Sequence, residues 1–539
     1  MPAGTRLKGA TLKLETYCYE VSSGIFTPNM VTQNSIAKNT FFLYVRMLLS
    51  LIVSLYTARI VLDVLGVDDY GIYIAVGGIA GFMSFVNSAL GNASTRFIMF
   101  ALGKDDKQNM EKTFSTSLTI HIILAFLIVA LGETVGLWFL HHKMVIPVER
   151  MSAAIWVYHV SIITAFFTIT QVPFTATINA HEHMSVYAFA SIIESILKLT
   201  IVFLLTVFQY DKLIVYSLLY FTVTLLMLMF YRFYCLRHFS ETHYKPRLYD
   251  HNVFKEISVF SGWSLLNSSG IAFIGQGVLL LLNMFFAPAV VSARAISLQV
   301  NGLAMQFSNN FKAAANPQII KRYANNEENS AKSLVLKTAK YSYFLMWFLA
   351  LPVCLLASPL LHAWLKIVPP YAVLFIQFVA IQSLFSTLQS SLFIAFYAKG
   401  RLKINTISTT LIYFIQFIVV YILFELGYSP ISLSIASLLT DVLLGVVLQP
   451  ILLNRMLGYS LPDLLQVLIP CVKISLFSAI LPLILYCLVD VHTIIGFFII
   501  GFSCVVSIAL TVWVCGLEEE IRLKVSEKIR SLVYSYIHK

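Results

Sequence analysis

Charged residues are scarce in this sequence. Only 12% of its 539 residues are Asp, Glu, Lys or Arg, whereas soluble domains carry roughly 25%. Hydrophobic residues make up 58% of the chain, and the mean hydropathy is +0.81. A soluble fold could not bury so much apolar surface. The composition therefore excludes an ordinary soluble domain and predicts an all-α polytopic membrane protein.

The motifs of several enzyme classes are also absent. The sequence contains no P-loop, HExxH or GxSxG motif, and its seven cysteines form no CxxC pair. We therefore expect no catalytic residue, no metal site and no cofactor. The loops are too short for a nucleotide-binding domain, so energy must come from an ion gradient, the membrane potential, the substrate's own gradient or a partner subunit.

The apolar runs are long enough to predict about fourteen transmembrane helices, because about 20 apolar residues cross a bilayer. They form two blocks of six spans, followed by two C-terminal spans. Similar patterns of apolar span, basic exit and polar loop in the two blocks indicate a pseudo-twofold parallel repeat. The predicted spans are 40–62, 71–95, 114–139, 152–176, 186–208, 213–235, 257–286, 291–313, 338–360, 371–397, 404–425, 430–453, 466–488 and 492–514.

The positive charges predict the orientation. Most of the 37 Lys and Arg residues lie in the two tails and in alternate loops, so both termini are expected in the cytoplasm. This distribution also argues against nucleic-acid binding despite the net charge of +11. Translation beginning at Met30 is a further hypothesis. The expected parts are a cytoplasmic tail (1–38), an N-lobe (39–236), a cytoplasmic linker (237–256), a C-lobe (257–454), helices 13–14 (455–515) and a cytoplasmic tail (516–539).

Polar residues inside the apolar spans identify candidate binding positions, because burying them in a bilayer is costly. At helical spacing they form stripes in the first two spans and in the corresponding spans of the second block. Packing of small polar residues between helices is the alternative explanation. The stripes include Asn39, Arg46, Ser50, Ser54, Asn87 and Ser88 in the first block, and Asn267, Arg294 and Asn301 in the second.

A few charged positions have distinct expected roles. Arg59 and Arg294 lie near the extracytoplasmic ends of their spans, where a basic side chain can reach the interface, and Arg96 lies at the cytoplasmic edge. Glu194 is four residues before Lys198, so the two are expected to form a helical ion pair. Glu194 and Asp441 are the mid-span carboxylates and hence the candidates for ion coupling.

Residues 38–105 resemble the opening of Wzx-like polysaccharide and O-antigen flippases of the multidrug/oligosaccharidyl-lipid/polysaccharide exporter superfamily. The LGVDDYGIY turn after the first span and the NASTRF exit from the second carry the resemblance. It implies two six-helix lobes that alternate between inward-facing and outward-facing states in the bacterial inner membrane. The implied substrate is an undecaprenyl-diphosphate-linked oligosaccharide, an O-antigen or a capsular or exopolysaccharide repeat unit, moved to the periplasmic leaflet.

Under this resemblance, the diphosphate would contact Arg46, Arg59, Arg96 and Arg294, because Arg binds phosphate oxygens in a bidentate manner. The Ser and Asn stripes would contact sugars. Surrounding membrane lipid, coupling to protons or sodium, and contact with the polysaccharide polymerase machinery are further partners left open. The alternatives are a drug or small-molecule exporter of the same fold, a membrane polysaccharide polymerase or ligase, and an assembly subunit without transport activity.

Overall fold

The computed structural model describes residues 33–83, 85–103, 107–181, 183–519, 522–523 and 526–527; it describes side chains from residue 51, apart from a few helix positions. Within these residues the chain forms only helices and their connections. The predicted all-α class is thereby confirmed. The expected tails, 1–38 and 516–539, lie largely outside the described residues, so the hypothesis about Met30 remains a prediction.

The helices follow one another in membrane-length runs, some of them continued by a single π-helical turn. In the first block these are α2 (Gln33–Met83), α3 (Phe85–Gly103), α4 (Lys107–Leu131), η1 (Gly132–Gly136), α5 (Leu137–Lys143), α6 (Met151–Ala180), α7 (Met184–Val207) and α8 (Lys212–His238). The second block contains α9 (His251–Ala272), η5 (Phe273–Gly277), α10 (Val278–Phe285), α11 (Pro288–Ala324), α12 (Glu328–Leu355), α13 (Ala357–Trp364), α14 (Ala372–Ala398), α15 (Leu402–Glu425), α16 (Ile431–Val442), η6 (Leu443–Leu448) and α17 (Gln449–Leu457). The last pair is α18 (Leu461–Leu488) and α19 (Ile494–Thr511), the latter extended by η7 (Val512–Gly516).

Every predicted span falls on helix, and eleven segments of the described residues are long and apolar enough to cross a membrane. The other three predicted spans, 40–62, 71–95 and 291–313, lie on α2, α3 and α11. These helices carry the polar stripes.

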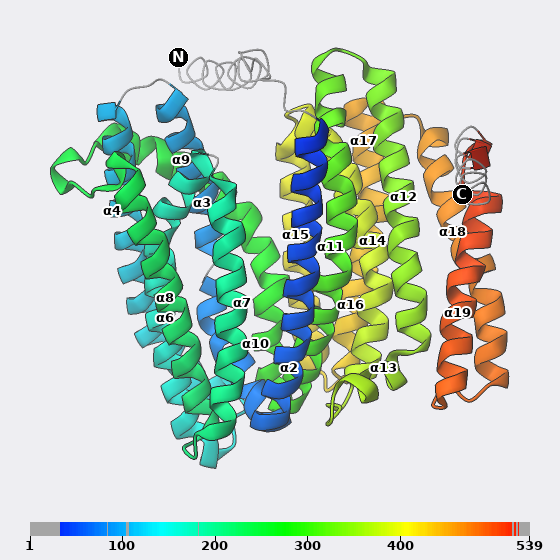
Figure 1. Cartoon of the computed structure of the whole chain (residues 1–539), viewed down its shortest axis with the longest axis horizontal. Coiled ribbons are helices and arrows are strands. Elements are labelled where there is room, and N and C mark those ends of the chain that lie inside the picture. The colour runs from blue at the N-terminus through cyan, green and yellow to red at the C-terminus, as the bar shows by residue number, and fades with distance from the viewer. Residues whose placement is uncertain are drawn as a thin grey trace, which may run out of the picture.

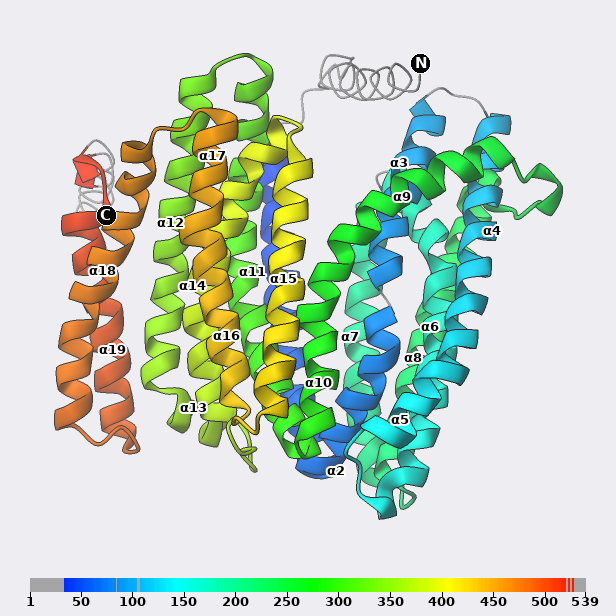
Figure 2. The ribbon, with the colours of Figure 1, turned by 180° about the vertical axis from the view of Figure 1, so that it is seen from behind.

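The two blocks stand side by side, with α18 and α19 at the outer edge of the second (Figure 1). We call the end of the bundle where residues 239–250 connect the blocks the linker end, and the other the opposite end. The blocks approach each other near α10 at the opposite end and diverge toward the linker end in both views (Figures 1 and 2). The core follows this arrangement, since its largest cluster includes buried residues of both blocks, from Val61 to Leu433.

The first helix of each block also contacts the other block. Gln299 on α11 donates hydrogen bonds to the carbonyl oxygen (3.1 Å) and hydroxyl (3.0 Å) of Ser54 on α2. Trp364 donates to the Leu55 carbonyl oxygen at 3.0 Å. Conversely, α9 packs against α3 of the first block and then against α15 of its own. The boundary between the two blocks is therefore crossed by α2 and α9.

Helices α18 and α19 are attached to the second block through α12. Tyr343 shares a hydrogen bond with Ser475 at 2.9 Å, and Trp347 donates to Ser478 at 2.8 Å. Beyond α19, Lys337 pairs with Glu518 at 2.7 Å. That hydrogen bond holds the pKa of the Glu518 carboxyl below its ordinary value. The helix pair is thus fixed to one block.

Candidate functional site

The LGVDDYGIY motif is the turn that joins the two arms of α2. Gly66 has φ +80° and ψ 169°, a conformation that is essentially restricted to glycine. Gly71 lies against the turn between α10 and α11, where a Cβ would be 2.0 Å from the Pro288 carbonyl oxygen. Tyr73 packs edge-on against Tyr216, with ring centroids 4.7 Å apart. The motif therefore specifies a kink and a close contact between the two blocks.

Further contacts between the blocks gather at the opposite end. Ser292 on α11 donates to the Val67 carbonyl oxygen at 2.5 Å. Val145 and Asn283 exchange two hydrogen bonds, of 3.0 Å and 3.3 Å. Lys366 pairs with Asp63 at 2.5 Å. The opposite end is thus held closed by backbone contacts, hydrogen bonds and an ion pair.

An arginine within the first block joins three connections at the same end. Arg150 pairs with Asp69 at 2.5 Å and with Asp211 at 2.6 Å. Burial raises the pKa of Asp69, and Arg150 offsets this only in part. Burial also tends to raise the pKa of Asp211. However, Asp211 accepts hydrogen bonds from Arg150 and from the Leu213 and Ile214 amides. These outweigh burial, so the pKa of Asp211 lies below its ordinary value.

Two of the predicted residues, Arg294 and Asp441, are buried in the second block and interact electrostatically, although no ion pair joins them among the described residues. The Arg294 guanidinium is buried over the Phe375 ring at 5.8 Å, and its Nε and Nη1 have no hydrogen-bond partner among the described residues. Its charge interacts with that of Asp441 on α16. Asp441 accepts a hydrogen bond from Gln382 at 2.9 Å. The structure therefore brings a buried cation together with a buried carboxylate.

Lys312 is a second buried cation on α11, and it is not among the site residues predicted from the sequence. It is 6% exposed, and its Nζ donates to the Ser390 hydroxyl at 2.7 Å. Within the described part of the chain it forms no ion pair. Eighteen residues, which are five helical turns, separate it from Arg294, so both lie on one face of α11. Extending the predicted stripe from Arg294 by five helical turns would have included Lys312.

Asn301 lies between these two cations on the same helix. Its Oδ1 has no hydrogen-bond partner in the described structure. With Ser297 it lines a cavity of about 20 Å³ between α11, α12 and α14, enough for one water molecule. The polar stripe of α11 thus faces the inside of the second block at this level.

The predicted residues of the first block are dispersed. Glu194 pairs with Lys198 at 2.7 Å, as predicted from their spacing. Asn87 on α3 has an unpartnered Oδ1 within the described residues. Arg59 is half-buried toward the opposite end of α2, and Arg96 is exposed near the linker end of α3. These side chains belong to different levels of the bundle, so the structure does not gather them into one site.

Five predicted residues have side chains that lie outside the described part of the structure. Their backbones lie on α2, α3 and α9, and their roles remain predictions. They are Asn39, Arg46, Ser50, Ser88 and Asn267.

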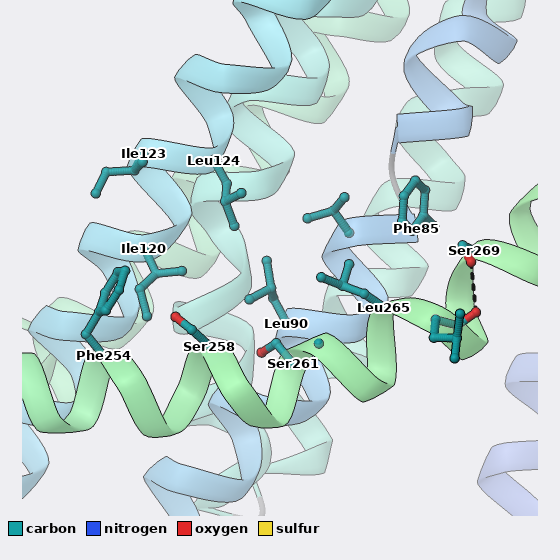
Figure 3. Close-up of a pocket in the computed structure, with 13 residues that line it drawn as sticks. Phe85, Leu90, Ile120, Ile123, Leu124, Phe254, Ser258, Ser261, Leu265 and Ser269 are labelled. Atoms are coloured by element: carbon teal, nitrogen blue, oxygen red, sulfur yellow. Dashed lines mark hydrogen bonds between the residues drawn. The ribbon is translucent and has the colours of Figure 1, made fainter. Parts of the chain in front are cut away.

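A groove of about 590 Å³ lies where α9 crosses α3 and α4. Figure 3 shows Leu90 from α3, Ile120 and Leu124 from α4, and Phe254 and Leu265 from α9 around the same space. The lining is apolar apart from three serines of α9. No group of three or more potential metal ligands was found in the described part of the chain.

Comparison with known proteins gives a result for the fold alone. No protein-family model and no curated protein sequence matches this chain. Among solved structures, it is similar to the lipid II flippase MurJ in an inward closed conformation, with TM-score 0.67, 14% identity and coverage of 87% of this chain and 97% of that one. It is also similar to an inward-facing multidrug resistance MATE transporter of the MOP superfamily, with TM-score 0.64, 13% identity and coverage of 76% and 96%. The chain has the fold shared by these two solved structures.

This shared fold includes both blocks of membrane-length helices. The similarity covers nearly the whole of each neighbour, so it extends across both blocks. It agrees with the superfamily that the sequence resembles.

Proposed function

We propose that this chain is a flippase that carries undecaprenyl-diphosphate-linked oligosaccharide across the bacterial inner membrane by alternating access. The MOP fold and the resemblance of residues 38–105 to Wzx-like flippases support it. The glycan is an O-antigen, capsular or exopolysaccharide repeat unit. A drug exporter of the same fold is the second candidate, because a MATE transporter is among the structural neighbours.

The observation that carries the proposal is the sign of the charges buried in the bundle. Arg294 and Lys312 lie on one face of α11, and Asp441 is the carboxylate whose charge interacts with Arg294. A diphosphate needs cationic partners, whereas a site for cationic drugs would favour carboxylates. Arg46, Arg59 and Arg96 are retained as proposed diphosphate contacts, and the Ser and Asn stripes as proposed sugar contacts.

In the described conformation the opposite end is held closed, and the helices of the two blocks diverge toward the linker end (Figures 1 and 2). The basic linker end is assigned to the cytoplasm, with both termini on that side, and the contacts around Gly71 and Ser292 close the periplasmic end. Transport would require these contacts to break while the blocks approach each other at the linker end.

Asp441 is the better candidate for coupling to protons or sodium. It is buried and bonded to Gln382, whereas the charge of Glu194 is compensated by Lys198. Exchange of an ion at Asp441 would alter its interaction with Arg294, and so connect ion binding to the cationic stripe of α11.

The test is accumulation of cytoplasm-facing lipid-linked oligosaccharide in cells that lack the protein. We expect wild type and Lys321→Gln, a control at an exposed position of the same helix, to remove it. Arg46→Ala and Lys312→Gln should fail at matched membrane expression, while Lys312→Arg should retain activity. If lipid-linked oligosaccharide does not accumulate in the deletion strain, the proposed substrate is rejected. If that strain instead becomes more sensitive to drugs, the drug exporter is favoured.

A further inference from the structure

The groove between α9 and the pair α3 and α4 is a direct result of how the linker is attached. The Lys245 amide donates to the Ser115 hydroxyl at 3.2 Å, and the Asp250 amide donates to the Thr116 hydroxyl at 3.0 Å. Both hydroxyls belong to α4, so α9 begins beside the first block. Figure 2 shows α9 descending from there across α3 toward α10. The groove lies under this crossing helix.

The face of α9 above the groove consists mainly of small residues. Ser258, Ser261, Gly262 and Ser269 fall at helical spacing on that face and line the space together with Leu265. Small residues usually allow membrane helices to approach closely. Here they border an open volume instead, and a Cβ on Gly262 would meet no atom within 4 Å. Their size therefore makes room for an occupant.

The dimensions and lining of the groove fit an extended hydrocarbon chain. From Phe254 to Ser269 the lining follows sixteen residues of α9, and the first and last of them are about 22 Å apart along the helix. Its volume of about 590 Å³ is within the usual range of ligand sites. Since the walls are apolar and lie within membrane-spanning helices, water is a poor occupant.

Two observations favour an isoprenoid with an anionic headgroup over an ordinary acyl chain. Ser261 is 2% exposed and its hydroxyl has no partner in the described structure. An isoprenoid has a double bond in every repeat unit and so offers such a hydroxyl many weak π acceptors, whereas an acyl chain offers few or none. The linker-end rim is basic, since residues 107–112 and 245–256 contain five Lys or Arg residues and three Asp or Glu residues.

We infer that this groove binds the polyprenyl chain of the lipid-linked substrate, an inference that rests on the proposed function. The anionic group would stay at the basic linker end while the chain lies along α9. Because α9 reaches α15 beyond the groove, with Gly270 packed on Thr410, the bound chain lies on the helix that crosses between the blocks. The substrate thus remains attached to the moving element.

The test uses the full chain in nanodiscs of phosphatidylethanolamine and phosphatidylglycerol that contain undecaprenyl phosphate as the probe. Benzoylphenylalanine replaces Leu266, at the rim of the groove, or Leu476, which is exposed on α18. After irradiation, mass spectrometry gives the ratio of undecaprenyl to phospholipid adducts. We expect this ratio to be about tenfold higher at Leu266 than at Leu476. This corresponds to a modest preference of the groove for undecaprenyl phosphate over phospholipid.

Gly262→Leu should fill the groove and lower the ratio at Leu266 to that at Leu476. Gly302→Leu is the matched control, since Gly302 on α11 is also exposed and a Cβ added there would meet no atom within 4 Å. Equal ratios at both crosslinking sites, or enrichment that survives Gly262→Leu, would overturn the inference. Because the probe carries no sugar, enrichment without oligosaccharide accumulation in the deletion strain would reject the proposed function alone.

Discussion

Gly71 offers the sharpest test of how the opposite end is closed. Alanine at this position would place its Cβ 2.0 Å from the Pro288 carbonyl oxygen, and Cβ contacts under 3.0 Å are essentially never seen. The two backbones must therefore separate by about 1 Å. Overpacking of this kind costs about 1–3 kcal/mol, which disfavours the closed state by roughly 5- to 150-fold.

Gly78→Ala is the matched control. It lies two helical turns further along the same arm of α2, where the nearest atom to an added Cβ is 3.6 Å away, an ordinary contact. Both substitutions raise helix propensity by about 1 kcal/mol. Any difference between them therefore reports the contact with Pro288.

Distances between spin labels would measure the effect. Labels at Val148 and Leu426 lie on exposed loops of the two blocks at the opposite end, in a background with Cys18, Cys487 and Cys515 replaced by serine. We expect Gly71→Ala to add a population at longer distance, and Gly78→Ala to resemble wild type. Identical distributions for the two variants would refute the reasoning.

Two further predictions concern the same end of the molecule. Gly66→Ala should lower the free energy of unfolding by about 1–3 kcal/mol, because alanine is strained at φ +80°; an unchanged melting temperature in detergent would contradict this. Asp211→Asn keeps the cap of α8 but loses the charge paired with Arg150, so wild type should melt higher at pH 7. Since the folded pKa of Asp211 is lowered, its stabilisation is present above its unfolded pKa near 4 and is lost as the pH falls below it. A melting difference that persisted at pH 3 would oppose this explanation.

The helices could be predicted from the sequence because the bilayer fixes the length of an apolar span. The turn at Gly66 was also recognisable, as its motif stands between two such spans. The π-helical turns η1, η5, η6 and η7 could not be predicted, because one additional residue in a helical turn leaves no distinct pattern in an apolar run. Lys312 lies one residue before the end of the predicted span 291–313, and the predicted stripe did not extend to it.

The candidate site was less predictable than the helices. The stripe of Arg294 and Asn301 on α11 follows from helical spacing, but its direction depends on which helices surround α11. The electrostatic interaction of Asp441 with Arg294 depends on the packing of α16 beside α14. The attachment of the linker to α4 depends on hydrogen bonds from Ser115 and Thr116, which resemble ordinary polar residues at the end of a span.

The exchange of first helices between the blocks has a consequence for biosynthesis. The partner of Ser54, Gln299, is 245 residues later in the chain, and Trp364 is 309 residues after Leu55. The first helix to enter the bilayer must therefore remain without these partners until most of the protein has been synthesised. Ribosome-bound chains that end before α11 should hold this helix in a protease-sensitive arrangement, which full-length synthesis would remove.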